Sequence, residues 1–217
     1  MNTDSTKTSP ATPRIPLALK LAYSAFMVVL VPYYFVTYGP TNFLWFCDVA
    51  LIVTLIGIWR ESPFLISTQA VAIVLPQIAW IVSFVVQLVT GEPFIGLAGY
   101  MFDPTIPLFV RGLSMFHGWM PLLLIWLVVR VGYHPRAWKA QAVLAAVVLT
   151  TAFLVLEGPT GLAGNVNKVF GLDDKVPQTF MHPVAWVALL CAVYPMAIYL
   201  PSHLIFSKIM PRCAAAD

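Results

Sequence analysis

The chain has 217 residues, of which 60% are hydrophobic and 10% are charged, and its mean hydropathy is +0.85. A soluble domain is typically about 25% charged. The composition therefore excludes a soluble globular domain and indicates a polytopic membrane protein. The formal net charge of +3 is small, and most basic residues fall at the ends of apolar segments, which argues against nucleic acid as a partner.

Six apolar segments are long enough to cross a bilayer as helices. They cover residues 16–37, 42–59, 63–90, 107–130, 140–156 and 183–206. The sequence thus predicts an all-α integral membrane protein with a six-helix transmembrane domain over residues 16–209. Residues 1–15 are polar and rich in Ser, Thr and Pro, and we expect a disordered cytoplasmic tail there rather than a signal peptide. Residues 210–217 are expected to form a second cytoplasmic tail.

The basic residues predict the orientation of this bundle, because Lys and Arg beside a span stay preferentially in the cytoplasm. With the N-terminus inside, the outer side receives only Arg111, Lys168 and Lys175. The inner side receives the other nine: Lys7, Arg14, Lys20, Arg60, Arg130, Arg136, Lys139, Lys208 and Arg212. We therefore expect a multi-pass protein of a bacterial inner membrane with both termini inside. The two long connections, residues 91–106 and 157–182, then lie on the outer face.

The fourth segment carries ionisable side chains, which are costly in a bilayer and usually face the bundle interior or water. At about 1.5 Å per residue, His117 would lie roughly 15 Å down a helix that starts near Pro107, close to mid-membrane. Arg111 would lie nearer the surface, at a depth similar to that of Asp48 on the second segment. A buried Asp48–Arg111 ion pair could explain both of these residues. His117 could be a neutral imidazole bonded to a neighbouring carbonyl or hydroxyl.

Polar side chains gather in the outer half of the predicted bundle, which indicates a pocket open to the outer face. Within it, Cys47 is the candidate nucleophile and His117 the candidate base of a covalent catalytic site, although a Cys in an apolar helix is more often a small packing residue. The other candidate pocket residues are Thr41, Asn42, Asp48, Arg111, Ser114 and His182. Arg111 or Asn42 could stabilise an oxyanion, and Thr41 and Ser114 are alternative nucleophiles.

Cofactor binding has a weaker basis in the sequence. The four histidines, His117, His134, His182 and His203, are scattered, and no pair lies at i and i+4. No metal site is predicted, and haem b remains an alternative. The connection at residues 157–182 could be a lid over the pocket or a simple connector.

Two short motifs carry a family resemblance. FLWFCD at residues 43–48 opens the second segment, and FHG at residues 116–118 lies in the outer part of the fourth. With the six-span layout, they resemble the YwaF-like bacterial membrane proteins and, more distantly, the androgen-induced and androgen-dependent-regulator intramembrane hydrolases. In the hydrolases a threonine of the second span and a histidine of the fourth cleave lipid esters. The resemblance implies that His117 is the base. The FLWFCD motif of this sequence contains no threonine to match that of the hydrolases, and Thr41 lies just before the motif.

The favoured functional hypothesis is an intramembrane lipid hydrolase or acyltransferase with an outer-facing polar pocket, whose partner is membrane lipid. The alternatives are a small transporter and a non-catalytic subunit or assembly partner of a membrane complex, whose partner could be another membrane protein or a second copy of the chain. In these alternatives Asp48, Arg111 and His117 hold the bundle together. A transporter would be expected to show two matching halves with broken helices, and the sequence contains no obvious internal repeat.

Overall fold

The structure, a computed structural model, describes residues 15–213. The parts of the two predicted tails at residues 1–14 and 214–217 lie outside the described residues. Eight α-helices form the described chain: α1 (Leu17–Tyr38), α2 (Phe46–Arg60), α3 (Pro63–Thr90), α4 (Leu108–Ser114), α5 (Phe116–Val131), α6 (Ala137–Val155), α7 (Pro183–Tyr194) and α8 (Leu200–Ile209). Three 3-10 turns and one π-helical turn are η1 (Pro40–Leu44), η2 (Gly99–Phe102), η3 (Val166–Lys168) and η4 (Pro195–Tyr199).

Five helical segments are long and apolar enough to cross a membrane, which confirms the prediction of a helical multi-pass membrane protein. They are Leu17–Tyr38, Pro63–Thr90, Leu108–Val131, Ala137–Val155 and Pro183–Ile209. The third joins α4 to α5 across Met115, and the fifth joins α7 to α8 through η4. Large apolar side chains such as Val36, Val89 and Leu154 are more than 70% exposed on these helices. Such a surface suits contact with lipid rather than water.

The segment predicted at residues 42–59 is not one continuous helix. Its first residues belong to η1, Trp45 is extended at φ −62° and ψ 135°, and α2 then runs from Phe46 to Arg60. At 1.5 Å per residue the 15 residues of α2 span about 22 Å, shorter than the ~30 Å hydrocarbon core of a bilayer. The break brings Cys47 and Asp48 into the first turn of a helix.

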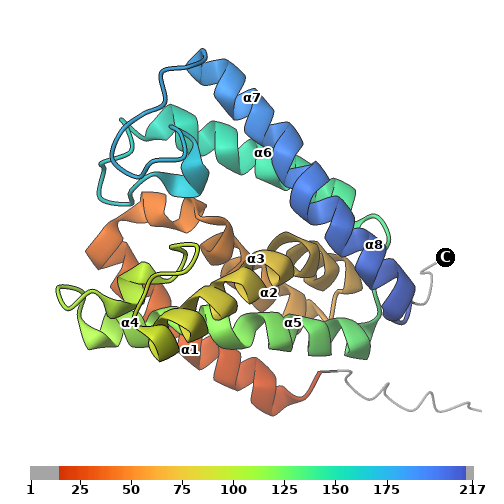
Figure 1. Cartoon of the computed structure of the whole chain (residues 1–217). Helices are drawn as coiled ribbons and strands as arrows, with labels where there is room; N and C mark the ends of the chain where they lie inside the picture. The colour runs from red at the N-terminus through yellow and green to blue at the C-terminus, as the bar shows by residue number, and fades with distance from the viewer. Residues whose placement is uncertain (1–14, 214–217) are drawn as a thin grey trace, which may run out of the picture.

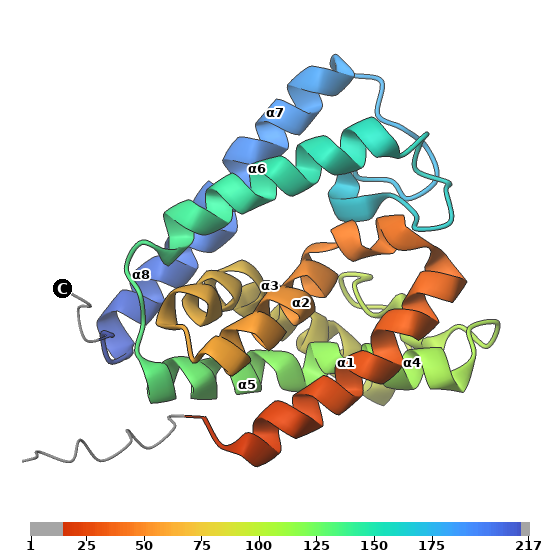
Figure 2. The ribbon, with the colours of Figure 1, turned by 180° about the vertical axis from the view of Figure 1, so that it is seen from behind.

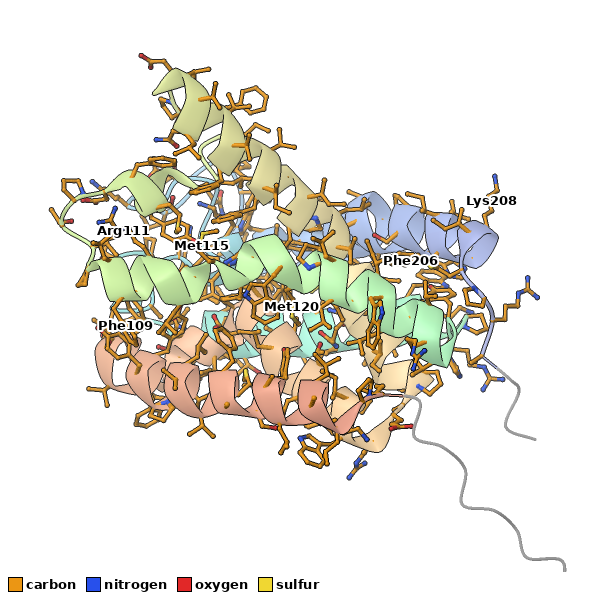
Figure 3. All side chains as sticks on the ribbon, turned by 90° about the horizontal axis from the view of Figure 1, so that it is seen from below. Phe109, Arg111, Met115, Met120, Phe206 and Lys208 are labelled. Carbon is orange, nitrogen blue, oxygen red and sulfur yellow. The ribbon has the colours of Figure 1, made fainter. Side chains whose placement is uncertain are left out.

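The helices converge so that both long connections lie at one end of the bundle and the ends of the described chain lie at the other (Figures 1 and 2). The longest helix, α3, packs most extensively on α5 and also contacts α2 and α6. Figure 3 shows α4 and α5 lying end to end along α1, with Phe109 on the side of α4 that faces α1 and Arg111 on another side. Lys208 marks the opposite end of the molecule from Arg111 (Figure 3).

Both long connections are folded onto the bundle, each over a small apolar cluster of its own. Val166 and Val169 of the connection between α6 and α7 are buried against Trp186 and neighbouring residues of α6 and α7. The connection between α3 and α4 buries Ala98 and Met101 against Trp80. Apolar burial of this kind fixes a loop in place. The two connections therefore form a packed cap over one end of the helices.

Candidate functional site

A cavity of about 640 Å³ lies under this cap. The end of α1, the start of α2, the middle of α3, the α4–α5 junction and both long connections contribute to its wall. The lining residues that bear on its chemistry are Tyr34, Tyr38, Asn42, Trp45, Cys47, Asp48, Trp80, Tyr100, Ser114, Phe116, His117, Lys168 and Asp174. Its volume falls within the range of about 300–1,000 Å³ that is usual for small-molecule sites.

Cys47 and Asp48 reach the cavity from the first turn of α2. The Cys47 thiol donates to Asp48 Oδ2 at 3.8 Å, and Asn42 Nδ2 donates to the same oxygen at 3.3 Å. Asp48 is only 4% exposed, and its Oδ1 has no hydrogen-bond partner among the residues that the structure describes. A buried carboxylate oxygen without a partner is costly. Asp48 therefore offers an unused acceptor beside the thiol.

The start of α2 also presents backbone donors. Helix geometry leaves the first amides without intrahelical acceptors. The Phe46 amide donates to Asn167 Oδ1 at 3.1 Å, and the amides of Asp48 and Val49 donate to the Trp45 carbonyl. The Cys47 amide belongs to the same turn and lies beside its own sulfur. The sulfur and the N–H group of one residue thus lie together at a helix N-terminus.

His117 lies in the first turn of α5, where the helical hydrogen-bond pattern is interrupted. The Gly118 amide donates to the Met115 carbonyl rather than to that of Ser114. His117 Nδ1 instead forms a hydrogen bond with the Ser114 carbonyl oxygen, at 2.8 Å. A carbonyl oxygen can only accept, so Nδ1 carries the proton and Nε2 of the neutral ring holds a lone pair. The ring stacks on Phe116 and Trp80, with centroids 4.0 Å and 5.1 Å away.

Two of the three tyrosines that line the cavity, Tyr34 and Tyr100, bear on its chemistry. The Tyr34 hydroxyl lies 3.0 Å from Ser114 Oγ, which ties α1 to the end of α4. Tyr100 comes from the connection between α3 and α4, and its burial raises the pKa of its phenol above the usual range. The Tyr100 hydroxyl is protonated at physiological pH, as an ordinary phenol is. Neither tyrosine was singled out from the sequence, because tyrosines near span ends are typical interfacial anchors.

The structure brings some of the predicted site residues together and separates others. Asn42, Cys47, Asp48, Ser114 and His117 line the cavity. Thr41, Arg111 and His182 are not among its lining residues. His182 caps α7, where its Nδ1 accepts from the Val184 amide at 3.3 Å. Its place at that helix end explains its separation from the cavity.

The expected Asp48–Arg111 ion pair is wrong. Within residues 15–213 the two side chains form no ion pair; Arg111 Nη1 instead donates to the Met101 carbonyl at 3.1 Å. Similar depth on two helices did not mean that the side chains face each other. The structure also places the His117 ring and the Cys47 thiol on separate hydrogen-bond partners, Ser114 and Asp48. They share the cavity without a bond between them.

Asn167 was missed altogether by the sequence analysis. Its Oδ1 accepts from the Phe46 amide, and its Nδ2 donates to the Leu44 carbonyl at 2.7 Å. It is 3% exposed and adopts a left-handed backbone conformation, with φ 49°. Asn tolerates that conformation better than most residues. The connection between α6 and α7 thereby fixes the break between η1 and α2 on which Cys47 and Asp48 depend.

Fold and cavity together define a class: a multi-pass helical membrane protein with a capped, mixed polar and aromatic cavity at one end of its bundle. Among the described residues, no group of three or more His, Cys, Asp or Glu side chains is arranged to hold a metal ion. Comparison of the chain with protein-family models, with curated proteins and with solved structures found no match.

Proposed function

We propose that the protein is a membrane-embedded acyl hydrolase or acyltransferase that acts on a lipid ester, with Cys47 as nucleophile and His117 as base. The single observation that supports this most strongly is that both side chains line one cavity of about 640 Å³, although they come from helices far apart in sequence. The protonated Nδ1 of His117 leaves Nε2 as a proton acceptor on the same ring. A six-span, N-in and C-in arrangement in an inner membrane, with α2 as a short span, belongs to the same proposal.

The proposed reaction has two stages. His117 Nε2 takes the Cys47 thiol proton as the sulfur attacks the ester carbonyl, and the Cys47 amide donates to the resulting oxyanion. The C–O bond then breaks, Nε2 returns the proton to the departing alcohol, and an acyl thioester remains on Cys47. In the second stage water or another acceptor gives its proton to Nε2 and attacks the thioester, which releases the acyl group and restores the thiol.

The resting contact of the thiol is compatible with this sequence of steps. The thiol now donates to Asp48 Oδ2 rather than to His117. In ligand-free sites catalytic hydrogen bonds are often long and tighten only when substrate binds. In the non-catalytic alternative Asp48, Arg111 and His117 hold the bundle together, and the bond from Arg111 to the Met101 carbonyl is a contact of that kind.

The test is direct detection of the thioester. The purified protein in lipid nanodiscs, supplied with a radiolabelled phospholipid, should accumulate label that hydroxylamine removes, and peptide mass spectrometry should place it on Cys47. Cys47→Ala should abolish the label, and His117→Gln should lower the labelling rate about 100-fold or more, the usual contribution of a general base. Cys191→Ser is the matched control, because Cys191 lies outside the cavity lining. Folded wild-type protein that never carries an acyl group on Cys47 would overturn the proposal.

A further inference from the structure

Asp48 has the surroundings of a cation-binding group, yet none of the Lys and Arg side chains that the structure describes forms an ion pair with it. Oδ2 already accepts from Asn42 and from the Cys47 thiol, while Oδ1 has no partner within residues 15–213. Arg111 donates to the Met101 carbonyl, and Lys168, which lines the cavity, pairs with Asp174. A buried charge that has no partner of opposite charge destabilises the fold. A positively charged ligand would offset this cost.

The wall around Asp48 is aromatic, which also favours a cation. The aromatic lining residues are Tyr34, Tyr38, Trp45, Trp80, Tyr100 and Phe116. The faces of such rings carry negative potential and attract ammonium groups. An anionic ligand would meet the Asp48 carboxylate, whereas the second acid of the lining, Asp174, is paired with Lys168. Charge and ring chemistry therefore select the same sign of ligand.

The dimensions of the cavity indicate an organic cation rather than a metal ion. About 640 Å³ is far more than a single ion requires. The described residues also lack a cluster of three potential metal-ligating side chains of the His, Cys, Asp and Glu types. A primary ammonium group has N–H donors for Oδ1, whereas a quaternary one has none. The unpaired oxygen thus favours the primary amine.

We propose that the cavity binds a primary ammonium group that donates a hydrogen bond to Asp48 Oδ1 and packs against the aromatic wall. The ammonium belongs to the headgroup of an amine-bearing lipid or to a free small amine. Its place in the reaction rests on the proposed function, but its binding does not. Because the Cys47 thiol contacts the other oxygen of Asp48, the bound amine lies close to the nucleophile.

The test measures binding in the Cys47→Ala protein, so that no turnover occurs. Isothermal titration compares short-chain phosphatidylethanolamine with phosphatidylglycerol of the same chains, and a further arm uses free ethanolamine. We expect the ethanolamine lipid to bind at least tenfold more tightly than the glycerol lipid. Asp48→Asn, which keeps the shape of the side chain and removes its charge, should abolish this preference. Asp174→Asn, the second acid of the lining, should retain most of it.

Each outcome bears on the inference. Equal binding of the two lipids, or an unchanged preference in a folded Asp48→Asn protein, would overturn it. If Asp48→Asn does not fold, Tyr100→Leu replaces it and should weaken ethanolamine-lipid binding alone; equal weakening of both lipids counts against the ammonium site. If free ethanolamine binds and Asp48→Asn abolishes that binding, the ligand is a soluble amine. If the ethanolamine lipid binds and free ethanolamine does not, the ligand is the lipid. If the protein binds the amine but wild-type protein never carries an acyl group on Cys47, the ammonium site stands and the proposed function is overturned.

Discussion

The side chain of Asn167 accepts a hydrogen bond from the amide of Phe46, a residue 121 positions earlier, at 3.1 Å. The same side chain donates to the Leu44 carbonyl at 2.7 Å, so Asn167 bridges both sides of the break at Trp45. Trp45 makes a further bond to this connection, from its Nε1 to the Ala163 carbonyl at 3.1 Å. The first turn of α2, with Cys47 and Asp48, is thus placed by the connection between α6 and α7.

Asn167 variants should separate the side-chain bonds from the backbone strain. Asn167→Gly keeps the left-handed conformation and loses two hydrogen bonds, which should lower the free energy of unfolding by about 1–3 kcal/mol. Asn167→Ala loses the same bonds and adds about 1–2 kcal/mol for a β-carbon in that conformation. Thermal unfolding in detergent, followed by circular dichroism, measures both. An alanine variant as stable as the glycine variant would contradict the conformational part.

Gly132 should not tolerate a side chain. Its φ is +89°, and a β-carbon there would lie 2.5 Å from Cys213 Cα. Gly132→Ala should disrupt the bridge in which the Tyr133 amide donates to the Pro211 carbonyl and the Cys213 amide to the Tyr133 carbonyl, with a loss of about 2–4 kcal/mol. Gly112→Ala is the control, because a β-carbon at this helical position meets no atom within 4 Å. Thermal melts of the two variants that shift equally would refute the steric argument.

Gln69 should be replaceable with a gain in stability. It is fully buried in α3, and neither atom of its amide has a partner among the described residues. Gln69→Met keeps a similar length and removes the unpaired polar atoms, which should raise the free energy of unfolding by about 1–3 kcal/mol. Gln69→Glu should lower it, since a carboxylate is costlier in that place. Denaturation in mixed micelles gives both changes, and a destabilised Met variant would show that the amide makes a needed bond.

Asp173 should stabilise the connection that contains Asn167 only while its carboxyl group is ionised. Its Oδ1 accepts from the amides of Lys175 and Val176, and these hydrogen bonds hold the pKa of the carboxyl below its usual range. A carboxyl with a lowered folded pKa contributes stability above its unfolded pKa, and that stability is lost as pH falls through the folded value. Hydrogen exchange of the two amides, corrected for intrinsic rates, should therefore accelerate below about pH 4. In Asp173→Asn the corrected rates should not vary with pH.

The sequence predicted the helical segments well where local signals mark their ends. Residues 63–90 were bounded correctly, because Pro63 follows the capping Ser62 and Gly91 ends the helix in a left-handed conformation. The segment at residues 42–59 was misjudged since its break is held by Asn167, a contact over long sequence separation that hydropathy does not encode. In the same way, depth along a helix could be predicted for Asp48 and Arg111, whereas the direction in which each side chain points depends on packing.

The residues around the cavity were only partly foreseeable. Cys47 and His117 stood out because ionisable and nucleophilic groups are rare in apolar segments. Tyr34, Trp80 and Tyr100 did not, since aromatic residues are abundant in such segments and usually serve packing or anchoring. One signal was available for Asn167: the stretch NVNKVFG at residues 165–171, which places two asparagines close together in the connection between the fifth and sixth segments. Asn165 and Asn167 are both almost completely buried, as structural asparagines are.

The rim of the cavity differs from its floor. Leu97 and Leu162, one from each long connection, belong to its lining and yet are 44% and 70% exposed, whereas Asp48 at the far side is nearly hidden. An amphiphile that enters headgroup first leaves its hydrocarbon tail against these leucines, and the reverse orientation would strand the tail beside a carboxylate. For the proposed amine-bearing lipid, this contrast between exposed leucines and a hidden carboxylate favours one orientation, with the ammonium group innermost and the acyl chains towards the membrane.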